Sequence, residues 1–137
     1  MPVGTIGNFL AAGPTPTQPS IVTFSTPIPY ISFLWGSPET FDTLTVMSIG
    51  GGGVQVFTNA DFGLPDNGDP AFAAYVQFQG IAGSLITSLE FTSTQNAFET
   101  SNYSITPVPA PEPGTIMLVA LGIGLAGLGF SRRQRKQ

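Results

Sequence analysis

The sequence predicts an all-β fold, a small antiparallel β-sandwich, followed by a proline-rich stalk and one C-terminal transmembrane helix. Short β-branched and aromatic runs recur about every 8 to 12 residues, and Gly, Pro and Asn turns separate them. No amphipathic helical pattern occurs before residue 115, whereas residues 115–130 form one unbroken apolar run. These observations predict the sandwich and the membrane helix respectively.

Residues 1–29 are predicted to form an extended connector, because prolines and many Ser and Thr residues interrupt residues 12–29. Within it, residues 21–24 are expected to pair at a sheet edge, where proline is tolerated. The first ten residues lack the basic and apolar regions of a signal peptide. We expect either a fragment or a start placed too far downstream, both of which would remove N-terminal strands; insertion directed by the C-terminal span alone is the third explanation.

Residues 30–106 are predicted to be the exported β-sandwich domain. Residues 30–36 and 41–49 favour strands, because both are rich in aromatic and β-branched residues. Alternation places these side chains on common faces: Ile31, Phe33 and Trp35 in the first strand, Leu44 and Val46 in the second.

The four glycines at positions 50–53 predict a hairpin, since they join the strand at 41–49 to another β run at 54–57. A phosphate-binding loop is the alternative, but neither a lysine nor a helix follows the glycines. A polar loop is expected at 59–70, and three further strands follow it: 72–79, 85–92 and 98–105. In the middle one, alternation predicts a shared face for Leu85, Thr87, Leu89 and Phe91.

Composition excludes several functions. The chain has no cysteine and no histidine, so disulfides, thiol chemistry and the commonest general base are absent. The exported part carries only acidic charges, which disfavours nucleic acid as a partner. A two-carboxylate enzyme could use Asp42 with Glu90 or Glu99, but the sequence does not place any such pair at the required separation. We therefore expect a protein that is not an enzyme.

The C-terminal part has three predicted segments: a proline-rich stalk at 107–114, a transmembrane helix at 115–131 and a basic cytoplasmic tail at 132–137. The apolar run is shorter than the hydrocarbon core of a typical bilayer, and either snorkelling arginines or local thinning of the bilayer would compensate. The alternative to a membrane span is a buried core helix. All the Lys and Arg of the chain lie in the tail, so the positive-inside bias places the tail in the cytoplasm. The stop-transfer residues are Arg132, Arg133, Arg135 and Lys136.

The order of Pro111, Glu112 and Pro113, a Gly-rich apolar span and an Arg cluster resembles the PEP-CTERM sorting signal. This resemblance implies recognition of the motif by exosortase, removal of the span and delivery to the cell surface. A plain single-pass anchor is the alternative. Residues 33–42 and 93–99 resemble blocks of PEP-CTERM surface proteins whose exported part is jelly-roll-like, and no catalytic residue is implied.

One polar loop offers oxygen ligands that suit calcium, although an ordinary solvated turn is the simpler interpretation. Its candidate ligands are Asp61, Asp66, Asn67 and Asp69. A sugar-stacking platform is a further hypothesis, and it would use Tyr30, Trp35, Tyr75 and Tyr103.

The sequence thus predicts a non-enzymatic exported protein of the cell surface or of an extracellular matrix such as a biofilm, recognised and processed by exosortase. In transit it would be a single-pass protein of the inner membrane, in contact with its lipid. The alternative is a surface binding module for polysaccharide or calcium on the same β-sandwich. No cofactor is expected apart from that calcium.

Overall fold

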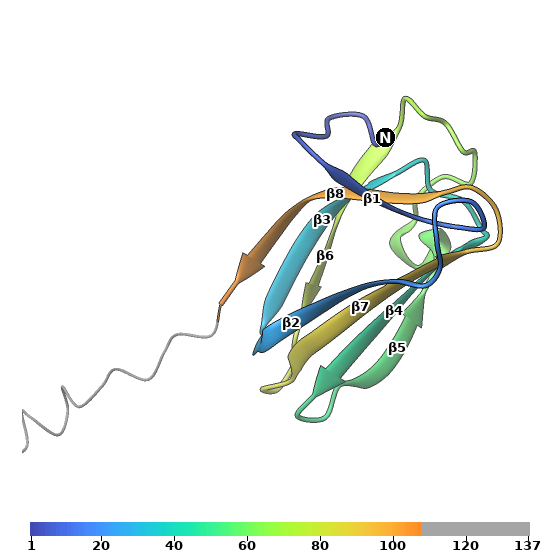
Figure 1. Ribbon diagram of the computed structural model, residues 1–137. Helices are drawn as coiled ribbons and strands as arrows, with labels where there is room; N and C mark the ends of the chain where they lie inside the picture. The colour runs from blue at the N-terminus through green and yellow to red at the C-terminus, as the bar shows by residue number, and fades with distance from the viewer. Residues whose placement is uncertain (108–137) are drawn as a thin grey trace, which may run out of the picture.

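The computed structural model describes residues 1–107, which form two four-stranded antiparallel sheets packed face to face (Figure 1). The elements are β1 (Phe9–Ala12), β2 (Ser20–Ile28), β3 (Tyr30–Gly36), β4 (Asp42–Ile49), β5 (Gly53–Phe57), the 3-10 helix η1 (Asn59–Phe62), β6 (Ala73–Gln79), β7 (Leu85–Ser93) and β8 (Phe98–Thr106). The strand orders are β1-β8-β3-β6 and β2-β7-β4-β5. Eight strands divided between two sheets in this way form a jelly roll. The predicted all-β sandwich is therefore confirmed.

The core lies between the sheets and is built by the predicted alternation. In β3, Ile31, Phe33 and Trp35 have no exposed surface. Phe33 meets Phe91 of the opposite sheet edge to face, with ring centroids 5.5 Å apart, and Trp35 stacks on Phe98 at 4.4 Å. These rings remove large apolar areas from water, and their geometry is the one that aromatic pairs prefer.

The structure differs from the predicted connector at residues 1–29. β1 pairs with β8, and β2 pairs with β7, so both sheets take a strand from this stretch. Prolines are compatible with β2 because it lies at a sheet edge, as predicted for residues 21–24. Pro27 falls where the pairing register shifts, between Thr23 and Ile28, and needs no ladder hydrogen bond there. The folded domain therefore begins well before residue 30.

The predicted face of β7 is wrong in its first half. The pairing with β4 passes from Met47 opposite Ser88 to Ser48 opposite Ile86, which leaves Thr87 as an extra residue. Such a bulge reverses which side chains point inward. Ile86 is therefore buried before the bulge, and Leu89 and Phe91 are buried after it.

The remaining strand predictions are confirmed, including the glycine hairpin between β4 and β5. The predicted stalk, transmembrane helix and basic tail lie outside the described residues, apart from Pro107. Within residues 1–107, no helix is long and apolar enough to cross a membrane.

Candidate functional site

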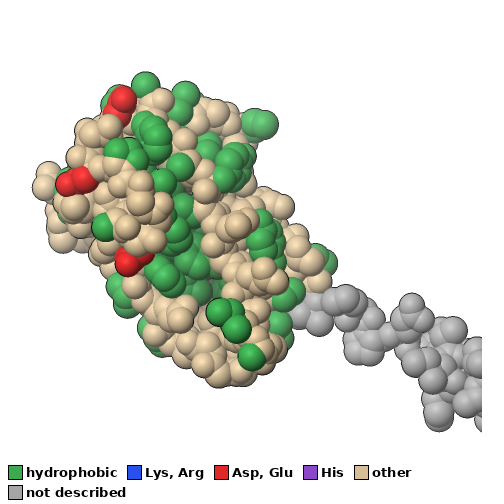
Figure 2. Space-filling model, turned by 180° about the vertical axis from the view of Figure 1, so that it is seen from behind, with side chains coloured by type: hydrophobic (Ala, Val, Ile, Leu, Met, Phe, Trp, Pro, Cys, Tyr) green, Lys and Arg blue, Asp and Glu red, His purple; other side chains and the backbone are tan. Residues whose placement is uncertain are grey.

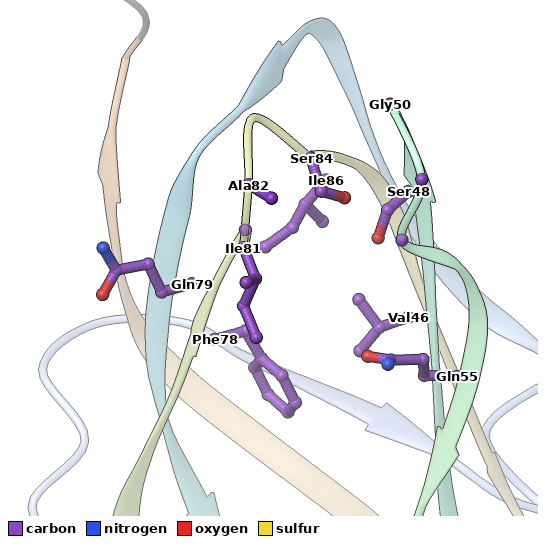
Figure 3. A pocket seen from close by; sticks show the side chains of 13 residues that line it. Val46, Ser48, Gly50, Gln55, Phe78, Gln79, Ile81, Ala82, Ser84 and Ile86 are labelled. Atoms are coloured by element: carbon purple, nitrogen blue, oxygen red, sulfur yellow. The ribbon is translucent and has the colours of Figure 1, made fainter.

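A pocket of about 330 Å³ lies at one end of the sandwich, where the β4–β5 hairpin meets the turn between β6 and β7 (Figure 3). Each sheet contributes to it, since β6 belongs to one sheet and β4, β5 and β7 to the other. The lining residues are Val46, Ser48, Gly50, Gly51, Gly52, Gln55, Phe78, Gln79, Gly80, Ile81, Ala82, Ser84 and Ile86.

Gly52 lets the β4–β5 hairpin approach the β6–β7 turn closely, and Gly80 lets the β6–β7 turn close on itself. A Cβ on Gly52 would overlap the Ser84 hydroxyl, and a Cβ on Gly80 would overlap the Ser84 carbonyl oxygen. The Ser84 hydroxyl donates a hydrogen bond to the Ile49 carbonyl oxygen at 3.1 Å, which ties the second turn to the first. The rim is therefore fixed by close backbone contact.

The pocket is apolar at its base and polar near its rim. Val46 and Ile86 are buried, and the ring of Phe78 lies below them in Figure 3. The Gln55 side chain points toward Val46, whereas that of Gln79 points away from the other labelled side chains. The lining residues include no charged side chain. Apolar walls with a few polar groups are typical of small-molecule sites.

An aromatic cluster closes the side of the sandwich next to the pocket. This side lies between β5 and β6, the last strands of their sheets. Phe57 and Phe78 lie 5.2 Å apart, and Phe62 of η1 lies 5.7 Å from the first and 5.5 Å from the second. Figure 2 shows hydrophobic side chains gathered along the middle of the molecule seen from behind. Phe78 thus belongs both to this cluster and to the pocket.

The pocket lies at the end of the domain where the chain leaves its last strand. Tyr30 pairs with Gln79 beside the pocket and with Thr106 at the end of β8. Gly36, at the other end of β3, pairs with Glu99, where β8 begins. The domain therefore has an exit end with the pocket and a far end with most of its carboxylates: Glu39, Asp42, Asp61, Asp66, Asp69 and Glu99.

The four proposed calcium ligands hold their own loops together. Asp61 accepts a hydrogen bond from the Thr58 amide at 2.7 Å and completes a capping box at η1. Asp66 accepts from the Thr40 amide at 2.8 Å. Two more bonds close the turn, Asp69 N–H to the Asn67 side chain at 3.1 Å and Ala71 N–H to the Asp69 carboxylate at 2.8 Å.

A metal site is not assembled in the part of the chain that the structure describes: there, no three His, Cys, Asp or Glu side chains lie close enough to hold an ion. Calcium binding therefore stays a prediction.

The carboxylates that an enzyme would need point in different directions. Asp42 is fully buried, while Glu90 lies between the inward-facing Leu89 and Phe91 and points to the outer face of the same sheet. Glu99 belongs to the other sheet and forms an ion pair with the Met1 amino group at 2.5 Å. The three acids therefore share no pocket.

Asp42 is the one carboxyl within residues 1–107 that has no exposed surface. Its Oδ2 accepts a hydrogen bond from Trp35 Nε1 at 3.4 Å. Its Oδ1 has no hydrogen-bond partner, nor has the Ser93 hydroxyl, although the two residues are paired across β4 and β7. Burial raises the pKa of Asp42 to about 6, because the charged form loses its hydration; the neighbouring Ser93 hydroxyl and the hydrogen bond from Trp35 oppose this rise.

The four residues of the proposed sugar-stacking platform do not all reach the surface. Trp35 is in the core, and Tyr103 is partly buried against Phe33 with ring centroids 5.5 Å apart. Burial raises the pKa of Tyr103 to about 12, and its hydrogen bond with Thr100 opposes the rise. Tyr75 is 64% exposed. Phe78, which the sequence predicted only as part of a strand, lines the pocket instead; the glycines in both turns were the available signal.

Comparison with known proteins identifies the end of the chain and not its folded domain. Residues 109–136 match the family model described as the PEP-CTERM protein-sorting motif. No curated protein matches the chain, and no solved structure does so either. The matched segment contains the predicted motif residues Pro111, Glu112 and Pro113 and the predicted stop-transfer residues, all of which lie outside the described residues. The chain thus carries a PEP-CTERM sorting signal directly after its jelly-roll domain.

Proposed function

We propose that this chain is a non-enzymatic exported protein that exosortase recognises and processes at its C-terminal signal, for display at the cell surface or in the extracellular matrix. The match of residues 109–136 to the sorting motif carries this proposal. In transit, the span at 115–131 holds the chain in the inner membrane, and the basic tail stays in the cytoplasm.

The arrangement of the domain supports display at a surface. The last strand ends at Thr106, and the matched signal begins at residue 109, so the exit end lies close in sequence to the site of processing. Most of the carboxylates lie at the far end, and all of these except the buried Asp42 are at least partly exposed to solvent. A uniformly acidic, hydrated far end favours solubility outside the cell and disfavours self-association.

Composition and geometry support a role without catalysis. The chain has no histidine or cysteine to act as a general base or nucleophile. Asp42 faces the core, Glu90 points to the outer face of the same sheet, and Glu99 lies at the start of β8 in the other sheet. Binding or structural display is the function that this arrangement favours.

The sorting proposal is tested by the intact mass of the chain from its native host, with and without the exosortase. We expect loss of the residues after about Pro113 only when the enzyme is present. A combined Pro111→Ala, Glu112→Ala and Pro113→Ala variant should keep its full mass in both strains. Pro107→Ala is the matched control, because Pro107 is a neighbouring proline that lies outside the matched signal. Equal full-length masses in both strains would show a plain membrane anchor and refute the proposal.

A further inference from the structure

We propose that the pocket between the β4–β5 hairpin and the β6–β7 turn binds a neutral sugar unit of a polysaccharide. The proposal concerns a site that the sorting signal does not contain. It rests on the charge of the pocket, its distribution of polar and apolar groups, and its position in the domain.

The charge of the pocket excludes most ionic ligands. No acidic or basic side chain lines it, and residues 1–107 contain no Lys, Arg or His at all. A phosphate, sulfate or uronate group would therefore enter without a counter-charge and would lose hydration, which is costly. A cation would find no carboxylate in the lining. The ligand that fits is uncharged.

The polar and apolar groups are divided as a sugar ring requires. A sugar presents hydroxyl groups around its rim and C–H groups on its faces. Gln55 offers both donors and an acceptor to hydroxyls, and Ser48 offers one donor and an acceptor. The C–H face would pack on Phe78 and on Ile81, whose side chain is 83% exposed. A ligand that covers an exposed isoleucine beside an aromatic ring removes apolar surface from water, and this burial favours binding.

The rim is already shaped before any ligand binds. Gly52 allows the β4–β5 hairpin to contact Ser84, Gly80 allows the β6–β7 turn to close on Ser84, and the Ser84 hydroxyl donates to the Ile49 carbonyl oxygen. A preformed pocket loses little conformational freedom on binding. Its volume, about 330 Å³, is at the small end of the range for ligand pockets, which suits one sugar unit of a polysaccharide and not a longer segment of it.

The position of the pocket indicates where its ligand is. It lies at the exit end, as Tyr30 shows by pairing with both Gln79 and Thr106. If the proposed display holds, this end faces the surface or matrix that retains the protein. The polysaccharide of that surface is then the occupant, and this last step alone rests on the proposed function.

The test is binding of the purified full chain to exopolysaccharide of the native host, separated by anion exchange into a neutral and an anionic fraction. The detergent must be non-glycosidic, since a sugar headgroup would compete for the pocket. We expect binding to the neutral fraction. Gln55→Ala and Ile81→Ser should each lower the affinity for the neutral fraction about tenfold, because each removes one or two contacts with the sugar. Both positions are exposed, so neither change should unfold the domain.

Gln77→Ala is the matched control, because Gln77 is exposed on β6 and does not line the pocket. It should bind as the parent does. Binding that is unaffected by Gln55→Ala and Ile81→Ser, binding to the anionic fraction alone, or no binding to the neutral fraction would each overturn the proposal. Because the assay uses purified chain, failure of sorting in the host leaves its result unchanged, and the two proposals fail separately.

Discussion

Replacing Asp42 with Asn should stabilise the protein at neutral pH and flatten its dependence on pH. The carboxyl is buried between the sheets and one of its oxygens has no hydrogen-bond partner, so ionising it in the folded protein costs free energy. The pKa rises from its ordinary value of 3.8 to about 6 in the folded protein. At about 1.4 kcal/mol per pKa unit, this difference corresponds to about 3 kcal/mol.

The sign follows from proton binding. Between pH 3.8 and about 6 the folded state holds a proton that the unfolded state has released, so stability falls as pH rises through this window. The contribution of Asp42 is therefore fully present below pH 3.8 and lost above about 6. Asn stays neutral at every pH, can accept the hydrogen bond from Trp35 and offers a donor to the Ser93 hydroxyl. We expect the variant to match the parent near pH 4 and to exceed it by about 2 to 3 kcal/mol at pH 7.5.

Urea unfolding followed by fluorescence is the suitable assay, because Trp35 is the only tryptophan of the chain and is buried in the core. With an m value of about 1–3 kcal/mol/M, the midpoint of the variant should rise by about 1 M or more at pH 7.5. Glu90→Gln is the control, since it removes a carboxyl from the outer face of the same sheet and leaves Asp42 in place, so the fall in stability that Asp42 causes should persist. Parallel profiles for the parent and Asp42→Asn, or a less stable variant at pH 7.5, would refute the reasoning.

Three further predictions concern packing and the acidic loop. Gly80→Ala should lower the free energy of unfolding by about 1–3 kcal/mol, because its Cβ would overlap the Ser84 carbonyl oxygen. Ala82→Gly in the same turn should be neutral or stabilising, because Ala82 has a φ of 52°; equal losses in both variants would contradict the steric argument. Phe91→Ala should cost about 3–5 kcal/mol, since the ring is fully buried against Phe33 and Phe98, and a loss below 1 kcal/mol in urea titration would show that the site is not close-packed. Millimolar calcium should leave the melting temperature unchanged, because Asp66 and Asp69 are engaged in their own turns; a rise reversed by a chelator would instead establish the calcium hypothesis.

Local patterns predicted most of the strands because each depends on near neighbours. The alternation of Ile31, Phe33 and Trp35 defines an inward face wherever the strand lies. The connector at 1–29 was predicted wrongly for a related reason: its prolines argue against a central strand, but whether β2 is central or at an edge is decided by its partner. The inward face of β7 likewise depends on a bulge opposite β4, and nothing within β7 marks it.

The candidate pocket was not predictable from its separate parts. Two glycine-bearing turns about thirty residues apart in sequence become its rim only because β4 and β6 end at the same end of the sandwich. The burial of Asp42 has the same origin. In the sequence it is one acid among others near a turn, and the packing of the two sheets places it beside Trp35.

The sequence by itself determined the β character of the domain, the absence of thiol and imidazole chemistry, and the sorting signal, because composition, alternation and a contiguous motif are properties of the chain. Tertiary structure alone decided which strands pair, which carboxyl is buried, and that a neutral pocket forms beside the point where the chain leaves its last strand. These features come from contacts between residues distant in sequence, whose geometry is set when the two sheets pack against each other.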